Sequence, residues 1–234
     1  MRRPIILISL LLLCGGCASE TEPVPRGPDV VFIVPGVGGP TGYDALIRDL
    51  QRPNRSIEMV RWGAPPPLFF LNFSDKNIHD DAESQFSAMI SKWRRDHPGG
   101  RIDVIGHSAG CGVALGAIAM LKETRVHHLI LLAPSVSPSY DLHPALARVY
   151  SPVHVFTSRE DSLLEWRTRT WATYDRISTP AAGVGGFAAS FSSPMLIRHE
   201  FTDSWRSLGH DGGHWGTLAD QFARKMIVPL LESD

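Results

Sequence analysis

The chain has 234 residues, of which 43% are hydrophobic and 20% charged, and its formal net charge is −1. This length suits one domain with a sizeable core, and the composition is that of a globular protein, not of a disordered chain or a polytopic membrane protein. The near-neutral charge argues against the basic surface that nucleic-acid-binding proteins normally present, so no nucleic acid partner is expected.

The first predicted element is an export signal over residues 1–16. Two arginines precede a short apolar run, which small residues follow, and this run is too short to span a bilayer. The segment CGGC at 14–17 resembles the bacterial lipobox, although Cys14 stands where that motif prefers leucine. The resemblance implies lipidation of Cys17 and a membrane anchor in the cell envelope. Export as a soluble periplasmic or secreted protein and an uncleaved cytoplasmic start are the alternatives.

Residues 17–28 are rich in proline and polar groups, which predicts a tether, and one domain is expected over 29–234. Strands are predicted at 30–34, 56–62, 101–106, 127–133, 151–158 and 195–201, and helices at 42–51, 78–95, 113–123 and 217–232, the last interrupted or bent near Pro229. Apolar strands that alternate with helices predict an α/β fold: a mostly parallel sheet of about six strands, covered by helices on both faces. Ligands of such sheets bind at the carboxyl ends of the strands.

A serine stands at the turn after the third predicted strand. The segment GHSAG at 106–110 has the pattern G-x-S-x-G between a strand and a helix, which is typical of a nucleophile elbow around Ser108. Small residues on both sides let neighbouring backbone pass closely, and the following helix directs its amide groups at the serine. A glycine-rich strand-to-helix turn, as in nucleotide-binding folds, is the alternative.

With this motif, the chain from residue 29 to its end resembles the α/β-hydrolase superfamily, and within it the esterase- and lipase-like serine hydrolases. The resemblance implies a catalytic triad in the chain order Ser, Asp, His, together with an oxyanion hole. It implies a small-molecule or lipid ester as substrate and no metal or organic cofactor.

In this superfamily two backbone amides bind the oxyanion. The resemblance implies that one belongs to Ala109, directly after the nucleophile, and the other to the loop after the first strand. That loop reads PGVGG at 35–39, so Val37 is the second predicted donor. A dinucleotide-binding loop fails on spacing because Thr41 stands where G-x-G-x-x-G requires glycine. A plain tight turn is the remaining alternative.

Two histidines compete as the general base within LGHDGGHWG at 208–216. Gly-Gly-His followed by an aromatic residue and a helix is most similar to the family pattern, so His214 is predicted as the base. His210 is then a supporting or surface residue. The two glycines between the histidines, and the lack of an evident third ligand, argue against a metal site.

The acid of this superfamily usually follows the second strand beyond the nucleophile. That position predicts Asp161 as the residue that orients the imidazole of His214. Asp141, after the preceding strand, is an alternative, and Glu160 and Asp203 are weaker ones.

Two segments are candidates for substrate contact. Residues 63–73 are apolar for a loop, and they either line an acyl pocket, cover the site, touch the membrane or pack beneath the next helix. Residues 163–194 are longer than a plain connection and form either a lid or a structural insertion. His107 and Cys111, beside the serine, are expected to have structural roles.

Together these features predict a serine hydrolase that cleaves carboxylic esters. An acyltransferase with the same triad and a non-catalytic envelope binding protein with the hydrolase fold are the alternatives. The sequence carries no signal for a particular acyl chain or oligomeric state.

Overall fold

A computed structural model describes residues 27–64, 68–73, 75–188 and 193–232 of the chain. The predicted export signal, the predicted lipidation site at Cys17 and most of the predicted tether lie outside these residues. Among the residues described, no helix combines the length and the apolar character needed to cross a membrane.

The protein is built on one sheet of six parallel strands, in the order β2-β1-β3-β4-β5-β6. The strands are β1 (Asp29–Val34), β2 (Arg55–Met59), β3 (Ile102–His107), β4 (His128–Leu132), β5 (Val153–Thr157) and β6 (Leu196–Glu200). The direction of strand addition reverses beside β1, and Val34 at the end of β1 pairs in register with Gly106 of β3. The loops that follow β1 and β3 therefore leave the sheet side by side, where ligands of such sheets bind.

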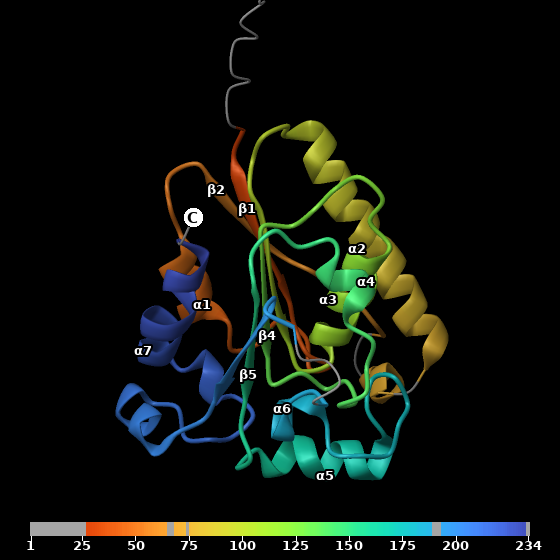
Figure 1. Ribbon diagram of the computed structural model, residues 1–234, viewed down its shortest axis with the longest axis vertical. Helices are drawn as coiled ribbons and strands as arrows, with labels where there is room; N and C mark the ends of the chain where they lie inside the picture. Colours follow the sequence, from red (N-terminus) through yellow and green to blue (C-terminus); the bar gives the residue numbers. More distant parts are fainter. Residues whose placement is uncertain (1–26, 65–67, 74, 189–192, 233–234) are drawn as a thin grey trace, which may run out of the picture.

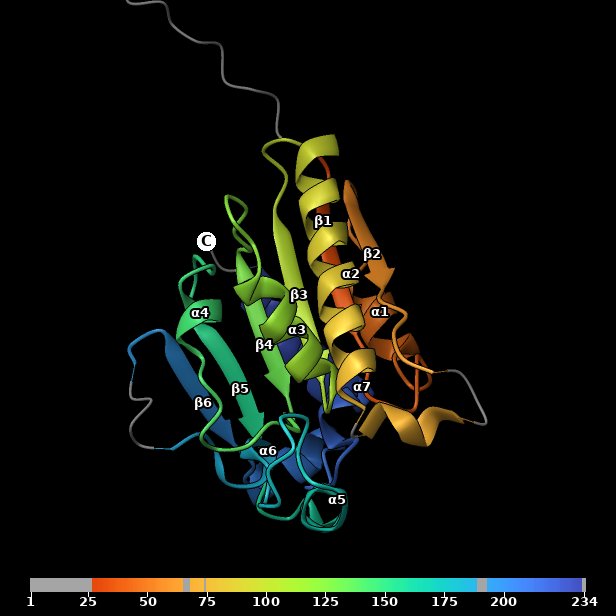
Figure 2. The ribbon, with the colours of Figure 1, turned by 90° about the vertical axis from the view of Figure 1, so that its right-hand side faces the viewer.

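Helices cover both faces of the sheet, as the sequence predicts. They are α1 (Asp44–Leu50), α2 (Lys76–Asp96), α3 (Gly110–Ala119), α4 (His143–Leu146), α5 (Ser162–Trp171), α6 (Ala182–Gly185) and α7 (Asp220–Phe222). Helices α1 and α7 lie on one face and α2, α3 and α4 on the other (Figure 1). Helices α5 and α6 lie across the carboxyl ends of the strands, at the bottom of both views (Figures 1 and 2).

Each face of the sheet has its own apolar core. Helix α2 is amphipathic and buries Phe86 and Ile90 at helical spacing, with the ring of Phe86 packed edge-on against Phe32 of β1. On the other face, Phe222 of α7 packs against Phe156 of β5. Burial of each of these side chains contributes roughly 1.5–3 kcal/mol, so the two cores hold helices against both faces and fix the sheet between them.

Two predicted helices differ from the observed ones. Helix α3 begins at Gly110, three residues before the predicted start, and ends at Ala119. The closing helix over 217–232 is interrupted, as expected near Pro229, but the break begins earlier: α7 ends at Phe222 and is followed by a π turn, Ala223–Ile227, and a 3₁₀ turn, Val228–Leu231. The break has a local cause, because Pro229 lacks an amide hydrogen and its ring clashes with the carbonyl one α-helical turn earlier.

Candidate active site

The turn between β3 and α3 holds Ser108 in a strained backbone conformation. Its φ angle is +56°, in the left-handed region, which costs a residue other than glycine roughly 1–2 kcal/mol. Two glycines leave room for this turn: a Cβ on Gly110 would lie 2.2 Å from the carbonyl oxygen of Val34, and one on Gly106 would lie 2.9 Å from Cα of Cys111. The serine side chain is thereby presented at the carboxyl end of the sheet.

Ser108, His214 and Asp161 form one hydrogen-bonded chain. Nε2 of His214 lies 2.9 Å from Oγ of Ser108, and Nδ1 of His214 lies 2.7 Å from Oδ2 of Asp161. All three side chains are buried, with exposed fractions of 5% or less. Because an ionised carboxylate only accepts hydrogen bonds, the proton of the neutral imidazole belongs on Nδ1, which leaves Nε2 free to accept from the serine hydroxyl.

Asp161 is held in place by the helix that begins after it. Its second oxygen, Oδ1, accepts a hydrogen bond from the backbone amide of Leu164 at 2.9 Å and so caps α5. A side-chain cap of this kind stabilises a helix by about 1 kcal/mol. The same bond fixes the rotation of the carboxyl group, so Oδ2 points at the imidazole.

The three alternative acids lie elsewhere. Asp141 is exposed and hydrogen-bonds to His143, while Glu160 and Asp203 both pair with Arg206. Among the hydrogen bonds of the described residues, none joins these carboxylates to the imidazole of the predicted base. Of the four predicted acids, the structure therefore brings only Asp161 into the chain with Ser108.

His210 is buried, not at the surface. Its side chain packs edge-on against the ring of Phe222, and its Nδ1 accepts a hydrogen bond from the amide of Gly212 at 3.0 Å. Burial lowers the pKa of His210 to about 4, so the ring is neutral near pH 7. The surface alternative for His210 is wrong, and the residue supports the loop that carries the predicted base.

A second hydrogen-bonded chain lies behind the first and involves Tyr43, the residue directly before α1. The amide of Gly36 donates to the hydroxyl of Tyr43 at 3.3 Å, and that hydroxyl lies 2.9 Å from Nδ1 of His107. Nε2 of His107 lies 3.1 Å from the backbone carbonyl of His214. Full burial, together with the nearby His214, lowers the pKa of His107 to about 3. A neutral ring accepts from Tyr43 and donates to the carbonyl.

The predicted oxyanion donors lie beside the serine hydroxyl. Val37 and Ala109 line the same small cavity as Ser108. Within the described part of the chain, neither of their amide groups donates a hydrogen bond to the protein. Two unpaired amides beside a serine are the arrangement that binds a developing negative charge on a carbonyl oxygen.

That cavity has a volume of only about 20 Å³, and α5 forms much of its wall. Its lining includes Leu164, Arg167 and Thr168 on the inner face of α5, and Phe73 from the apolar loop 63–73. The two segments predicted to contact substrate thus both reach the serine. Residues 65–67 and 189–192 of these segments lie outside the described residues.

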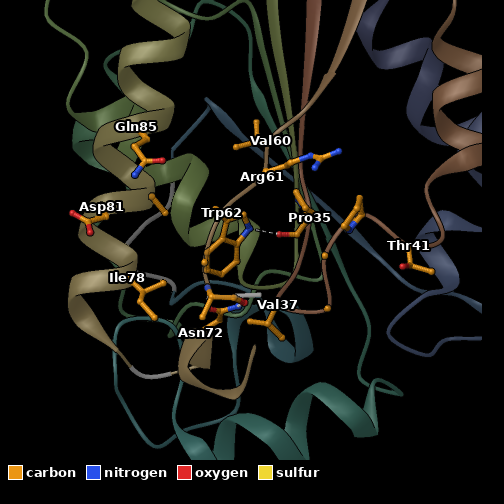
Figure 3. A pocket seen from close by; sticks show the side chains of 16 residues that line it. Pro35, Val37, Thr41, Val60, Arg61, Trp62, Asn72, Ile78, Asp81 and Gln85 are labelled. Atoms are coloured by element: carbon orange, nitrogen blue, oxygen red, sulfur yellow. Dashed lines mark hydrogen bonds between the residues drawn. The ribbon is translucent and has the colours of Figure 1, made fainter. Parts of the chain in front are cut away.

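A larger groove, of about 1020 Å³, adjoins the small cavity at Val37, which lines both (Figure 3). It runs between the loop after β1, the segment after β2 and one side of α2. Trp62 stands in its wall, and its indole nitrogen donates to the carbonyl of Pro35 at 2.8 Å (Figure 3). The groove offers space for a substrate group far larger than the small cavity holds.

Cys111 has no part in these hydrogen-bonded chains. The thiol is fully buried and lies 3.5 Å from the carbonyl oxygen of Leu132. Burial raises the pKa of the Cys111 thiol, so it stays protonated and unreactive. This agrees with the structural role expected for it.

Solved structures that are similar to this chain include a thioesterase and a phospholipase. The RedJ thioesterase from the prodiginine biosynthetic pathway of Streptomyces coelicolor has a TM-score of 0.47 and 14% identity, covering 88% of this chain and 89% of its own. Phospholipase PlaB from Legionella pneumophila, solved with thio-NAD, has a TM-score of 0.36 and 18% identity. That match covers 58% of this chain and 39% of the phospholipase, so the chain corresponds to well under half of that protein.

The family comparison is more direct. No curated protein matches the sequence significantly. The family model described as "Alpha/beta hydrolase of unknown function (DUF900)" matches residues 43–184, a range that includes Ser108 and Asp161 and ends before His214. Since this match spans more than half of the chain and the observed sheet has the expected architecture, the protein belongs to this family of α/β hydrolases.

Proposed function

We propose that the protein is a serine hydrolase that cleaves carboxylic esters through a covalent acyl-enzyme. Ser108 is the nucleophile, His214 the general base and acid, and Asp161 the residue that orients His214. The observation that carries the proposal is the buried chain of hydrogen bonds of 2.9 and 2.7 Å through these three side chains.

In the first half of the reaction, Oγ of Ser108 attacks the ester carbonyl while its proton moves to Nε2 of His214. The carbonyl oxygen becomes negative, and the amides of Val37 and Ala109 donate hydrogen bonds to it. His214 then gives the proton to the leaving alcohol as the bond between carbonyl carbon and alcohol oxygen breaks. Asp161 stabilises the imidazolium in between without taking the proton.

In the second half, water replaces the alcohol. His214 removes a proton from the water, whose oxygen attacks the acyl carbon and forms a second tetrahedral intermediate. The bond to Oγ breaks, the proton returns to the serine, and a carboxylic acid leaves. The strained φ angle of Ser108 supports this role, because strain of this kind is retained where it presents a reacting group.

A fluorophosphonate probe, which forms a bond with activated serines, tests the proposal. We expect the purified protein to be labelled and the Ser108→Ala variant to remain unlabelled. Ester hydrolysis by Ser108→Ala should fall by a factor on the order of 10⁴ to 10⁶. Ser207→Ala, an exposed serine on a 3₁₀ turn, is the matched control and should react like wild type. Equal labelling of Ser108→Ala and wild type would refute the assignment.

A further inference from the structure

One cationic side chain stands in the wall of the cavity beside Ser108. Arg167 lies on the inner face of α5, three residues after Leu164 and next to Thr168. Among the described residues that line this cavity, Arg167 alone carries a formal charge. The reaction proposed above gives it no part to play, so its presence there needs a separate explanation.

The flat face of the Arg167 guanidinium packs against an aromatic ring, while its N–H groups donate no hydrogen bond to the described residues. Its Cζ lies 4.1 Å from the ring centroid of Phe73, and Phe73 stacks in turn on Trp171 at 5.3 Å. No oxygen of the described residues accepts a hydrogen bond from Arg167, whereas Arg169, two positions on, pairs with Glu165 at 2.9 Å. Stacking on an aromatic face leaves the forked N–H donors of an arginine available to a ligand.

The nearest acid does not occupy these donors. Asp161 attracts Arg167 electrostatically, but its carboxylate is 1% exposed and both its oxygens are engaged, with His214 and with the amide of Leu164. The side chain of Arg167 is half-buried, and burial lowers the pKa of its guanidinium. A partly desolvated charge without an ion-pair partner gains free energy when an anion binds it.

We propose that Arg167 binds an anionic group, a carboxylate or a phosphate, that the ester substrate carries close to the scissile carbonyl. This inference rests on the proposed function and names the substrate class: an ester with a negative charge on its acyl or its alcohol part. The planar fork of a guanidinium matches both oxyanions through two parallel hydrogen bonds. The cavity itself is small, but Val37 also lines the adjoining groove of about 1020 Å³, which offers space for the rest of such a substrate.

A purely structural role predicts different behaviour. If Arg167 only holds α5 against Phe73, its loss weakens the packing over the site and affects every ester in the same way. If Arg167 binds the substrate's anion, its loss affects only esters that carry the charge. Paired substrates that differ in this charge therefore separate the two roles.

The experiment uses two sets of esters with purified full-length protein. On the acyl side, 4-nitrophenyl hexanoate is compared with the mono-4-nitrophenyl ester of adipic acid, which has the same acyl length and a terminal carboxylate. On the alcohol side, methyl 4-acetoxybenzoate is compared with 4-acetoxybenzoate and with 4-acetoxyphenyl phosphate. The sets show which side carries the charge and whether carboxylate or phosphate is preferred.

We expect wild type to hydrolyse at least one anionic ester with a kcat/KM roughly ten to a hundred times that of its neutral partner. Arg167→Met should bring the ratio of the two kcat/KM values close to 1, because its loss lowers kcat/KM for the anionic ester more than for the neutral one. Arg167→Lys keeps the positive charge but not the forked donors, so its preference for the anionic ester should lie between those of wild type and Arg167→Met. Arg169→Met, the same change on the exposed side of α5, should leave every value unchanged.

Two failures are distinguishable. Ser108-dependent hydrolysis of neutral esters with no preference for an anionic partner, or equal losses for both partners in Arg167→Met, overturns the inference and leaves the proposed function intact. Absence of any Ser108-dependent hydrolysis and of probe labelling overturns both. The wild-type comparison needs no variant, so the test does not depend on how well Arg167→Met folds.

Discussion

At the scale of single residues, the proposed catalytic residues are held in place by side chains outside the triad. The hydroxyl of Tyr43 connects the amide of Gly36, beside the predicted oxyanion donor, to the ring of His107. His107 in turn holds the backbone carbonyl of His214. Three segments that are distant in sequence are thus joined by one buried chain of hydrogen bonds, which fixes the proposed oxyanion donors and the proposed base relative to Ser108.

Removing the hydroxyl of Tyr43 tests this chain. In Tyr43→Phe, the amide of Gly36 and Nδ1 of His107 both lose their partner while remaining buried, so the free energy of unfolding should fall by about 1–3 kcal/mol. Urea denaturation measures this difference. Tyr150→Phe makes the same chemical change at an exposed position and should stay within about 0.5 kcal/mol of wild type. A Tyr43→Phe variant as stable as Tyr150→Phe would show that the chain contributes nothing.

At the scale of secondary structure elements, α5 joins several parts of the site. Its first turn is capped by Asp161, its inner face supplies Leu164, Arg167 and Thr168 to the cavity, and it ends at Ala172. At Ala172 the backbone has φ +66° and ψ 169°, a region adopted almost only by glycine. The helix over the serine is therefore held by a cap at one end and leaves the chain strained at the other.

The strain at the end of α5 can be measured by substitution. Ala172→Gly removes roughly 1–2 kcal/mol of steric strain from the folded protein. The greater flexibility of glycine in the unfolded chain offsets roughly 0.5–1 kcal/mol of this gain. We expect it to raise the free energy of unfolding by about 0.5–1 kcal/mol. Ala147→Gly, at the end of α4 where φ is −64°, has no strain to relieve and should destabilise the protein by a similar amount. If both variants lose stability equally, Ala172 is not strained.

The sequence could predict those features of the fold and of the candidate site that depend on local patterns. The six strands and the long amphipathic α2 follow from apolar runs and helical spacing, which are local signals. Ser108, Asp161 and His214 follow from short motifs in the expected order. Tyr43 and Arg167 were missed because their importance depends on contacts with His107 and Phe73, more than sixty residues away. The one available signal for Arg167 was its position on the same helix face as Leu164 and Thr168.

At the scale of the whole molecule, the candidate site lies at the carboxyl ends of the strands, and β1 begins at the opposite end of the sheet. The beginning of β1 lies at the end opposite to α5 in both ribbon views (Figures 1 and 2). All six strands run in the same direction, so the loops with Val37, Ser108, Asp161 and His214 meet at their carboxyl ends.

The molecule also holds several histidines neutral by burial, and this predicts how its stability depends on pH. Burial lowers the pKa of His107 to about 3, and it lowers the pKa of others as well: His79, His127, His154, His199 and His210. Between the folded pKa and the unfolded value of about 6.5, the unfolded chain binds more protons. The stabilising contribution of these groups is therefore complete above pH 6.5 and is lost as the pH falls. Glu83, whose pKa is raised by burial, acts in the opposite sense.

Urea denaturation at pH 7.5 and pH 5.5 measures this dependence. On going from pH 7.5 to pH 5.5, His107 binds a proton in the unfolded chain but stays neutral in the folded protein. This difference alone should lower the free energy of unfolding by about 1.4 kcal/mol. His107→Gln is less stable at both values, but its difference between them should be smaller than that of wild type by this amount. An unchanged difference in His107→Gln would mean that His107 takes up a proton in the folded state, and its hydrogen bonds to Tyr43 and to the carbonyl of His214 would then need reassignment.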